Sequence, residues 1–193
     1  MPYTEDTLVQ QTTAEYLEKE LGWESVYAYN NETFGPEGTV GRASDREVVL
    51  VRALREKLVE LNPDLPAEAY DDAVRQIVAT VASQTLLVTN REKYDLIKHG
   101  VHVTFRNKAG ERVRQLLRVF DFSEPENNHF LCARELWVRG DLYRRRADIV
   151  GFVNGLPLLF IECKNIHKDL KAAFEQNYSD YLDTIPHLFH LGA

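Results

Sequence analysis

Charged side chains stand at the ends of two short apolar runs in the last quarter of the sequence. Residues 145–165 read RRADIVGFVNGLPLLFIECKN, with Asp148 before the first run and Glu162 and Lys164 after the second. Two converging carboxylates and the backbone carbonyl of Cys163 would supply the oxygen ligands that Mg²⁺ or Mn²⁺ prefers. Lys164 would orient or help to deprotonate an attacking water and stabilise the charge that develops on a phosphorus atom. The chemistry indicated is metal-assisted hydrolysis of a phosphodiester.

Two buried strands must position these groups. The runs Ile149–Val153 and Leu158–Ile161 are rich in Ile, Val, Leu and Phe, and the turn sequence Asn-Gly at 154–155 lies between them. Short apolar runs on either side of Asn-Gly predict a β-hairpin. Because side chains alternate between the two faces of a strand, we expect Glu162 and Lys164 on one face and Cys163 on the other.

The register of this hairpin decides whether the carboxylates meet. A plain two-residue turn would place Asp148 opposite Ile161, whereas a three-residue loop or a bulge would place it opposite Glu162. We expect the longer loop or a bulge, because only then do the acidic side chains converge. The alternative is that the charges are solvated caps at strand ends. Their attachment to strongly apolar strands favours the functional interpretation, since buried charges need a partner or a metal.

At this point the residues resemble a known family. Asp148, a strand ending in Glu162-Cys163-Lys164, and a helix carrying Gln176 and Tyr181 resemble the PD-(D/E)xK nuclease superfamily. The segments YTEDTLVQQTTAEYLEKELGWE, RADIVGFVNGLPLLFIECKN, AAFEQNYSDY and IPHLF more closely resemble the N-terminal endonuclease domain of the type I restriction enzyme R (motor) subunit. The resemblance implies an α/β (α+β) fold, with a mixed central sheet flanked by helices and an extra helical segment in the N-terminal half.

The resemblance also implies roles for individual residues. Asp148 and Glu162 match the metal-binding acids of the family, and Lys164 matches its catalytic lysine. Gln176 matches the glutamine of a Q-xxx-Y element on the following helix, but here Asp180 stands four residues later and the tyrosine is Tyr181. Which of these polar groups faces the site is therefore left open. Glu5 or Glu15 would be the first-helix acid that approaches the metal, although a solvated position is favoured for each.

The function implied is a Mg²⁺-dependent endonuclease, with Mn²⁺ as the alternative ion, that cuts double-stranded DNA in the restriction of foreign DNA. Methyltransferase (M) and specificity (S) subunits would be its partners. ATP would act only through domains absent from this chain, because no G-x-x-x-x-G-K-[ST] phosphate loop occurs in it. The alternatives are another PD-(D/E)xK nuclease, of repair or junction cleavage, and a non-catalytic nuclease-like module for DNA binding or docking.

Composition indicates one ordinary globular domain. The chain has 193 residues, of which 44% are hydrophobic and 10% aromatic. We expect a single endonuclease domain over 1–193, helical-rich in 1–100 and carrying the sheet and the site in 101–193, cut from a longer protein. No signal peptide or membrane span is visible, and both cysteines lie in strand-like runs. A reduced, cytoplasmic protein is expected.

The charge distribution is uneven. A net charge of −7 is not typical of a nucleic-acid-binding domain. Cations nevertheless crowd the middle of the chain, namely Arg106, Lys108, Arg112, Arg114, Arg118, Arg134, Arg139 and Arg144, Arg145 and Arg146. We expect phosphate contacts from this group and take Arg144, Arg145 and Arg146 as the candidate DNA-binding residues, the alternative being outward-facing strand positions.

Periodicity and punctuation predict the remaining elements. Helices are expected at 5–21, 44–61, 66–83, 91–98 and 167–184, and strands at 25–29, 101–106, 112–119, 130–138 and 187–191. Capping boxes, Ser44 with Glu47 and Thr89 with Glu92, set two of the helix starts. A zinc pair formed by His187 and His190 with Asp183 is a minor alternative, since zinc sites normally have more ligands.

Overall fold

Helices and strands follow one another along the chain in the computed structural model, which describes residues 5–81, 83–163 and 170–191. The helices are α1 (Glu5–Leu21), α2 (Val51–Leu61), α3 (Ala67–Val78), α4 (Leu86–His99) and α5 (Leu170–Thr184), with the 3₁₀ turns η1 (Tyr29–Asn31), η2 (Pro125–Asn127) and η3 (Pro186–Phe189). The strands are β1 (Glu24–Tyr27), β2 (Val101–Arg106), β3 (Arg112–Leu117), β4 (Phe130–Arg139), β5 (Arg144–Val153) and β6 (Leu156–Ile161). The fold is α+β, as predicted.

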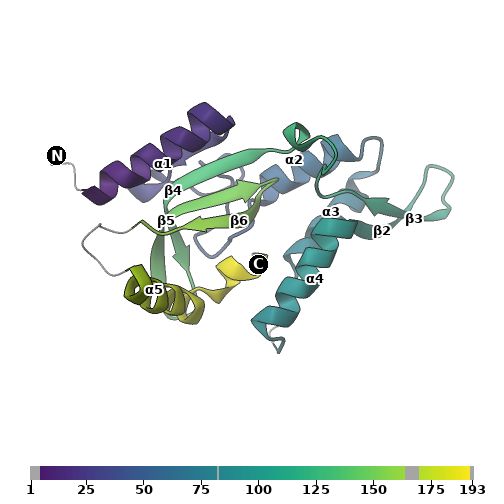
Figure 1. The fold of residues 1–193 in the computed structure, drawn as a ribbon. Helices are drawn as coiled ribbons and strands as arrows, with labels where there is room; N and C mark the ends of the chain where they lie inside the picture. Colours follow the sequence, from purple (N-terminus) through teal and green to yellow (C-terminus); the bar gives the residue numbers. More distant parts are fainter. Residues whose placement is uncertain (1–4, 82, 164–169, 192–193) are drawn as a thin grey trace.

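A mixed central sheet carries the candidate site. Its strand order is β1-β4-β5-β6, with β1 parallel to β4 and the other pairs antiparallel. Figure 1 shows α1 along one side of this sheet and α5 on the other. Among the described residues, none of the helices combines the length and apolarity that crossing a membrane would require.

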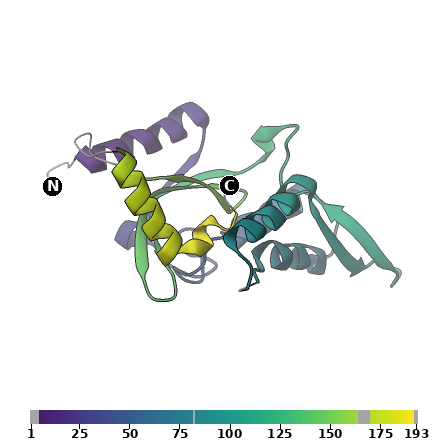
Figure 2. The ribbon, with the colours of Figure 1, turned by 60° about the horizontal axis from the view of Figure 1, so that its bottom comes forward.

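The hairpin of β2 and β3 forms a separate two-stranded sheet. The prediction that these strands would join the central sheet was wrong. Val101, Val103 and Phe105 alternate with exposed residues and pack in a cluster with α2 and α3, which leaves the other face of the hairpin in solvent. Figure 2 shows the hairpin projecting at the end of the molecule away from α5. Its edge is therefore covered by helices rather than by another strand.

The two faces of the central sheet bury different clusters. The α5 face holds Leu131, Ala133, Val150, Phe152 and Tyr181 of α5. The α1 face holds Cys132, Ile149 and Cys163 against Ala14 and Leu17 of α1. The α5-face cluster, however, also contains Leu136, Val138 and Ala147, which regular alternation along the strands would place on the α1 face.

Side-chain alternation in β4 therefore changes phase between Ala133 and Leu136. The residue responsible is Glu135, whose φ of 56° lies in the left-handed region that non-glycine residues seldom adopt. The register of β4 with β5 is the same on both sides of this point, so β5 changes phase with it, at Asp148. The pleat of both strands is thus reversed at the position where the first acidic site residue lies.

The helix α2 begins later than predicted. Segment 44–50 is not helical, because its polar groups make other bonds. The Glu47 side chain accepts from the Ala43 N–H at 2.7 Å, and its carbonyl accepts from the guanidinium of the fully buried Arg42 at 2.8 Å. The Leu50 N–H donates to the Gly155 carbonyl at 2.8 Å. The Ser44 capping box was therefore misleading, since residues 44–47 form a turn and the helix begins only at Val51.

The next two helices also differ from their predicted bounds. The α3 helix ends at Val78, where the buried Lys93 ammonium donates to the carbonyls of Gln76 and Ala79. The α4 helix starts at Leu86, because Thr85 accepts from the Val88 N–H at 3.4 Å and acts as the cap. The predicted cap, Thr89, is buried inside the helix. Gly100 ends α4 with φ 86°, as predicted.

The chain after α5 forms a 3₁₀ turn instead of the predicted strand. Pro186 starts η3, and Phe189 packs edge-on against Phe160 of β6 and Tyr178 of α5, with ring centroids 5.3 and 5.6 Å apart. These contacts require a compact turn beneath the sheet. The strands expected at 25–29 and 130–138 are present as β1 and β4, and α1 has its predicted bounds.

Candidate active site

The β5–β6 hairpin closes with a two-residue turn at Asn154 and Gly155. Both residues have positive φ, 50° and 79°, as a type I′ turn requires. The Asn154 side chain accepts from the His129 N–H at 2.7 Å and donates to the Val119 carbonyl at 2.9 Å. The turn is therefore buried and held by neighbouring loops and by α2, through the Leu50 bond to Gly155.

A bulge lies between this turn and the carboxylates. The register of β5 with β6 shifts between Gly151 and Phe152, and beyond the shift Ile149 pairs with Ile161. The next position outward on β5 is Asp148, and on β6 it is Glu162. The prediction of a bulge is confirmed, and it aligns the two acidic residues as the two-residue turn alone would not.

Backbone and side-chain donors hold both half-buried carboxylates in place. The Cys163 N–H donates to Asp148 Oδ2 at 2.7 Å, which joins the end of β6 to β5. The Tyr181 hydroxyl lies 3.0 Å from Glu162 Oε2 and 3.1 Å from the Arg146 carbonyl, and it donates to these acceptors. Cys163 itself packs toward α1 while Glu162 meets α5, so the two side chains lie on opposite faces, as predicted.

Helix α5 presents Tyr181 to the site and turns Asp180 away from it. Burial, and then the charge of Glu162, raise the pKa of Tyr181 far above its ordinary value, so that the phenol remains a donor. Asp180 instead forms a two-point ion pair with Arg145, at 2.6 and 2.8 Å. Of these two residues, Tyr181 contacts Glu162 and Asp180 does not, and which residue fills the role of the Q-xxx-Y glutamine stays open.

Two of the predicted site residues fall outside the described part. Lys164 belongs to the segment 164–169, and Gln176 lies in α5 with a side chain that is not described. Glu5 likewise begins α1 with an undescribed side chain, whereas Glu15 is ion-paired with Lys19 at 3.0 Å. The predicted roles of Lys164 and Gln176 therefore stay predictions.

The donor set suits a hard divalent cation. Asp148 and Glu162 supply two carboxylates on facing strand positions, and Mg²⁺ commonly uses one or two carboxylates and completes its shell with waters and phosphate oxygens. Over the described ranges, no three or more His, Cys, Asp or Glu side chains gather to hold a metal, which also removes the zinc alternative at His187. The residues fit magnesium better than a metal that needs an all-protein cage.

The arginines predicted to bind DNA each have a carboxylate partner. Arg144 lies 2.7 Å from Asp45, Arg145 is paired with Asp180, and Arg146 lies 2.6 Å from Glu135. DNA binding by Arg144, Arg145 and Arg146 stays a prediction. Their charges are already partly compensated within the protein, which the arginine count in the sequence did not reveal.

Glu135 is the residue near the site that sequence reasoning missed. It lies opposite Asp148 on β4, is buried, and pairs with Arg146, whose guanidinium lies 5.0 Å from the Tyr29 ring centroid. The only sequence signal is an acidic residue in an otherwise strand-like run from Phe130 to Val138.

Comparisons with known proteins show which proteins this chain resembles. A family model described as "Type I restriction enzyme R protein N terminus" matches residues 2–192. The chain is 37% identical over 185 residues to the type I restriction enzyme HindI endonuclease subunit of Haemophilus influenzae, covering 94% of this chain and 17% of that protein. It is 27% identical over 190 residues to the putative type I restriction enzyme MjaIXP endonuclease subunit of Methanocaldococcus jannaschii, covering 96% and 18%. The chain thus spans less than a fifth of the length of these relatives.

Proposed function

Because the chain belongs to the family of type I restriction enzyme R protein N-terminal regions, we propose that it is the magnesium-dependent endonuclease domain of such an R subunit. The observation that carries this proposal is the bulge that aligns Asp148, inside β5, with Glu162, directly after β6. A hairpin with regular pairing would separate these carboxylates, so the irregularity is explained by a need to bring them together.

The proposed mechanism assigns a task to each residue. Asp148, Glu162 and the carbonyl of Cys163 would hold Mg²⁺, with Mn²⁺ as the alternative ion. When bound, the ion supplies positive charge that stabilises the phosphorane-like transition state and makes water a better nucleophile. Lys164 would orient the attacking water, and Gln176 would support the site or the DNA backbone.

Two described hydrogen bonds support the positioning of the carboxylates. The Cys163 N–H holds Asp148 Oδ2, and the Tyr181 hydroxyl holds Glu162 Oε2. Donors to metal-ligating carboxylates fix their orientation and so increase metal affinity. We therefore assign Tyr181 a positioning role through Glu162.

The proposed substrate is double-stranded DNA, cut without sequence preference at the scissile bond in the restriction of foreign DNA. The methyltransferase and specificity subunits of the restriction complex are the proposed partners. ATP would act through domains outside this chain, and the proposed compartment is the cytoplasm.

Calorimetric titration with Mg²⁺ and Mn²⁺ tests the metal site. The wild-type chain should show a saturable signal, whereas Asp148→Asn and Glu162→Gln should lose it, because each removes one of two carboxylates. Asp141→Asn is the matched control, since this carboxylate is almost fully exposed at the β4–β5 turn and should not affect binding. Circular dichroism verifies that each variant is folded.

Equal metal binding by all four proteins would reject the assignment of the ion to Asp148 and Glu162. DNA binding that persists in chelator, without any metal signal, would instead favour a nuclease-like module used only for docking. Nicking of supercoiled plasmid that disappears in both site variants would complete the case for catalysis.

A further inference from the structure

A polar cleft of about 420 Å³ lies on the α1 face of the sheet, opposite to the face on which Glu162 meets Tyr181 of α5. It opens between α1, β1, η1, β4 and β5, of which Figure 1 labels α1, β4 and β5. Its lining consists of two glutamines, two tyrosines, two arginines and one glutamate: Gln10, Gln11, Tyr27, Tyr29, Arg134, Glu135 and Arg146. None of these residues was assigned to the metal site.

The cleft has an excess of positive charge. Arg146 is neutralised by Glu135 at 2.6 Å, but within the described part of the chain Arg134 has no ion-pair partner. The Arg134 Nε is buried and without a hydrogen-bond partner among the described residues. A buried guanidinium N–H that lacks an acceptor is costly. An anion in the cleft would contact the remainder of the Arg134 guanidinium, since Arg134 lines the cleft.

Aromatic rings fix the direction of both guanidinium groups. Arg134 lies 5.2 Å from the ring centroid of Tyr27, and Arg146 lies 5.0 Å from that of Tyr29. The two tyrosine rings stack on each other with centroids 6.1 Å apart. Stacking on a ring restricts a guanidinium to one plane, which prepares it for an anion with several acceptor oxygens.

The cleft is linked to the carboxylates through one strand and one hydroxyl. Arg146 precedes Asp148 by two residues on β5, and its carbonyl shares the Tyr181 hydroxyl with Glu162. Glu135 lies opposite Asp148 on β4. A DNA strand carries a phosphate for about every 3.4 Å of helix axis, so a strand placed at the carboxylates has further phosphates close by.

We propose that this cleft binds a backbone phosphate of the DNA substrate on the α1 side of the sheet. Arg134 is the principal cation, and the Gln10 amide at the α1 side donates to a further phosphate oxygen, whereas the Gln11 amide already donates to Glu15 at 2.8 Å. This inference rests on the proposed nuclease function, because it uses the same DNA molecule. It adds a contact that positions the substrate independently of the metal.

Salt-dependent DNA binding in the presence of chelator tests the cleft separately from the metal site. Fluorescence anisotropy of a short labelled duplex gives the affinity of the wild-type chain at several salt concentrations. Arg134→Ala should weaken binding about tenfold at low salt and reduce the slope of log K against log salt by about 0.9. Arg134→Lys should keep the slope, because it keeps the charge.

A second pair of variants covers the case in which Arg134→Ala does not fold. Gln11→Glu and Thr12→Glu add the same charge to neighbouring positions of α1, but only Gln11 lines the cleft. Gln11→Glu should therefore weaken DNA binding by several-fold more than Thr12→Glu, because it places a carboxylate against the phosphate. Arg91→Ala, on the exposed side of α4, should leave both affinity and slope unchanged.

Each outcome decides the proposal. An unchanged slope in Arg134→Ala, equal effects of the two α1 variants, or no DNA binding by the wild-type chain would overturn the phosphate cleft. If metal binding persists in calorimetry while DNA binding fails, only the cleft is rejected. If DNA binding depends on Arg134 while metal binding at Asp148 and Glu162 fails, the nuclease proposal is rejected and the cleft stands as a DNA-binding site.

Discussion

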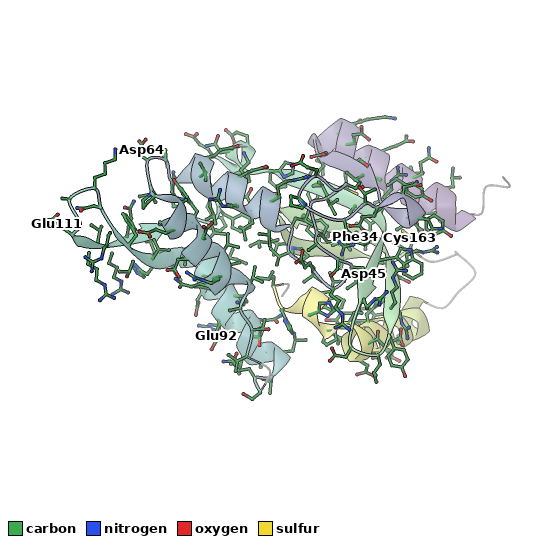
Figure 3. All side chains as sticks on the ribbon, turned by 180° about the vertical axis from the view of Figure 1, so that it is seen from behind. Phe34, Asp45, Asp64, Glu92, Glu111 and Cys163 are labelled. Atoms are coloured by element: carbon green, nitrogen blue, oxygen red, sulfur yellow. The ribbon has the colours of Figure 1, made fainter. Side chains whose placement is uncertain are left out.

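Two antiparallel hairpins in the described part of the chain have Asn and Gly in their turns, and the two turns make different contacts. The β5–β6 turn is buried, and its groups bond to α2 and to the loops before β4. The β2–β3 turn is exposed, and Asn107 bonds only to residues of its own loop, at Ala109 and Glu111. Figure 3 places Cys163, after β6, and Glu111, in the β2–β3 turn, at opposite ends of the molecule.

The difference shows how a precise site can be obtained from a strand pair. A turn that bonds only to itself fixes local pairing, whereas a turn tied to its surroundings also fixes where the hairpin sits. The β5–β6 hairpin combines such a turn with a bulge, so that the position of its far end is determined. The carboxylates are at that far end. The β2–β3 hairpin has regular pairing throughout and carries none of the proposed catalytic groups.

The largest contrast should come from one substitution made in both turns. Gly155→Ala places a methyl group 2.4 Å from the Leu50 carbonyl at φ 79°, whereas Gly110→Ala meets nothing within 4 Å at φ 80°. We expect losses of roughly 2–5 kcal/mol at Gly155 and about 1 kcal/mol at Gly110 in the free energy of unfolding. Urea denaturation measures both, and equal losses would contradict the distinction between the two turns.

The turn asparagines should follow the same order with a smaller difference. Asn154→Ala leaves the buried Val119 carbonyl and His129 N–H without their side-chain partner, which should cost roughly 2–4 kcal/mol. Asn107→Ala removes bonds at an exposed loop and should cost about 1 kcal/mol. Thermal melts of the two variants measure this difference. A larger loss of stability at Asn107 than at Asn154 would contradict the prediction.

At the site end of the β5–β6 hairpin, Tyr181→Phe should have a modest effect on stability. Loss of the hydroxyl removes the bonds to Glu162 and Arg146 and should cost about 1 kcal/mol. Because Glu162 is then less well oriented, the affinity for Mg²⁺ should fall about tenfold or more in calorimetry. Tyr178→Phe, on the more exposed side of α5, is the control and should retain wild-type affinity.

The smallest expected effect is the pH dependence of stability that comes from the two histidines of segment 187–190. Burial lowers the pKa of His187 and of His190 below the ordinary 6.5. In acid the unfolded chain therefore binds more protons than the folded chain. The contribution of these histidines to the free energy of unfolding is fully present above about pH 6.5 and is lost as the pH falls through their lower pKa values in the folded protein. The urea midpoint should drop in acid. His190→Gln should reduce that drop, while His102→Gln, on the exposed face of β2, should leave it unchanged.

Local sequence signals predicted the strands and the site hairpin better than the helix starts. Apolar runs next to Asn-Gly identified β5 and β6, and the need for convergence of Asp148 and Glu162 identified the bulge. The capping box failed at Ser44 because the segment after it makes bonds outside a helix, and at Thr89 because Thr85 caps the helix one turn earlier. The pairing of Arg144 with Asp45 was equally hidden, since the two residues are far apart in the chain.

The phase reversal at Glu135 has a consequence for recombination and for design. Segment 130–139 would not fit a sheet with regular pleating. If the apolar residues of its first half were buried on one face of such a sheet, Leu136 and Val138 would point to the opposite face. It fits only beside a strand with the matching reversal, which β5 carries at Asp148. These two strands therefore form a single unit of exchange, and a crossover between related domains that separated them would disrupt the core as well as the site.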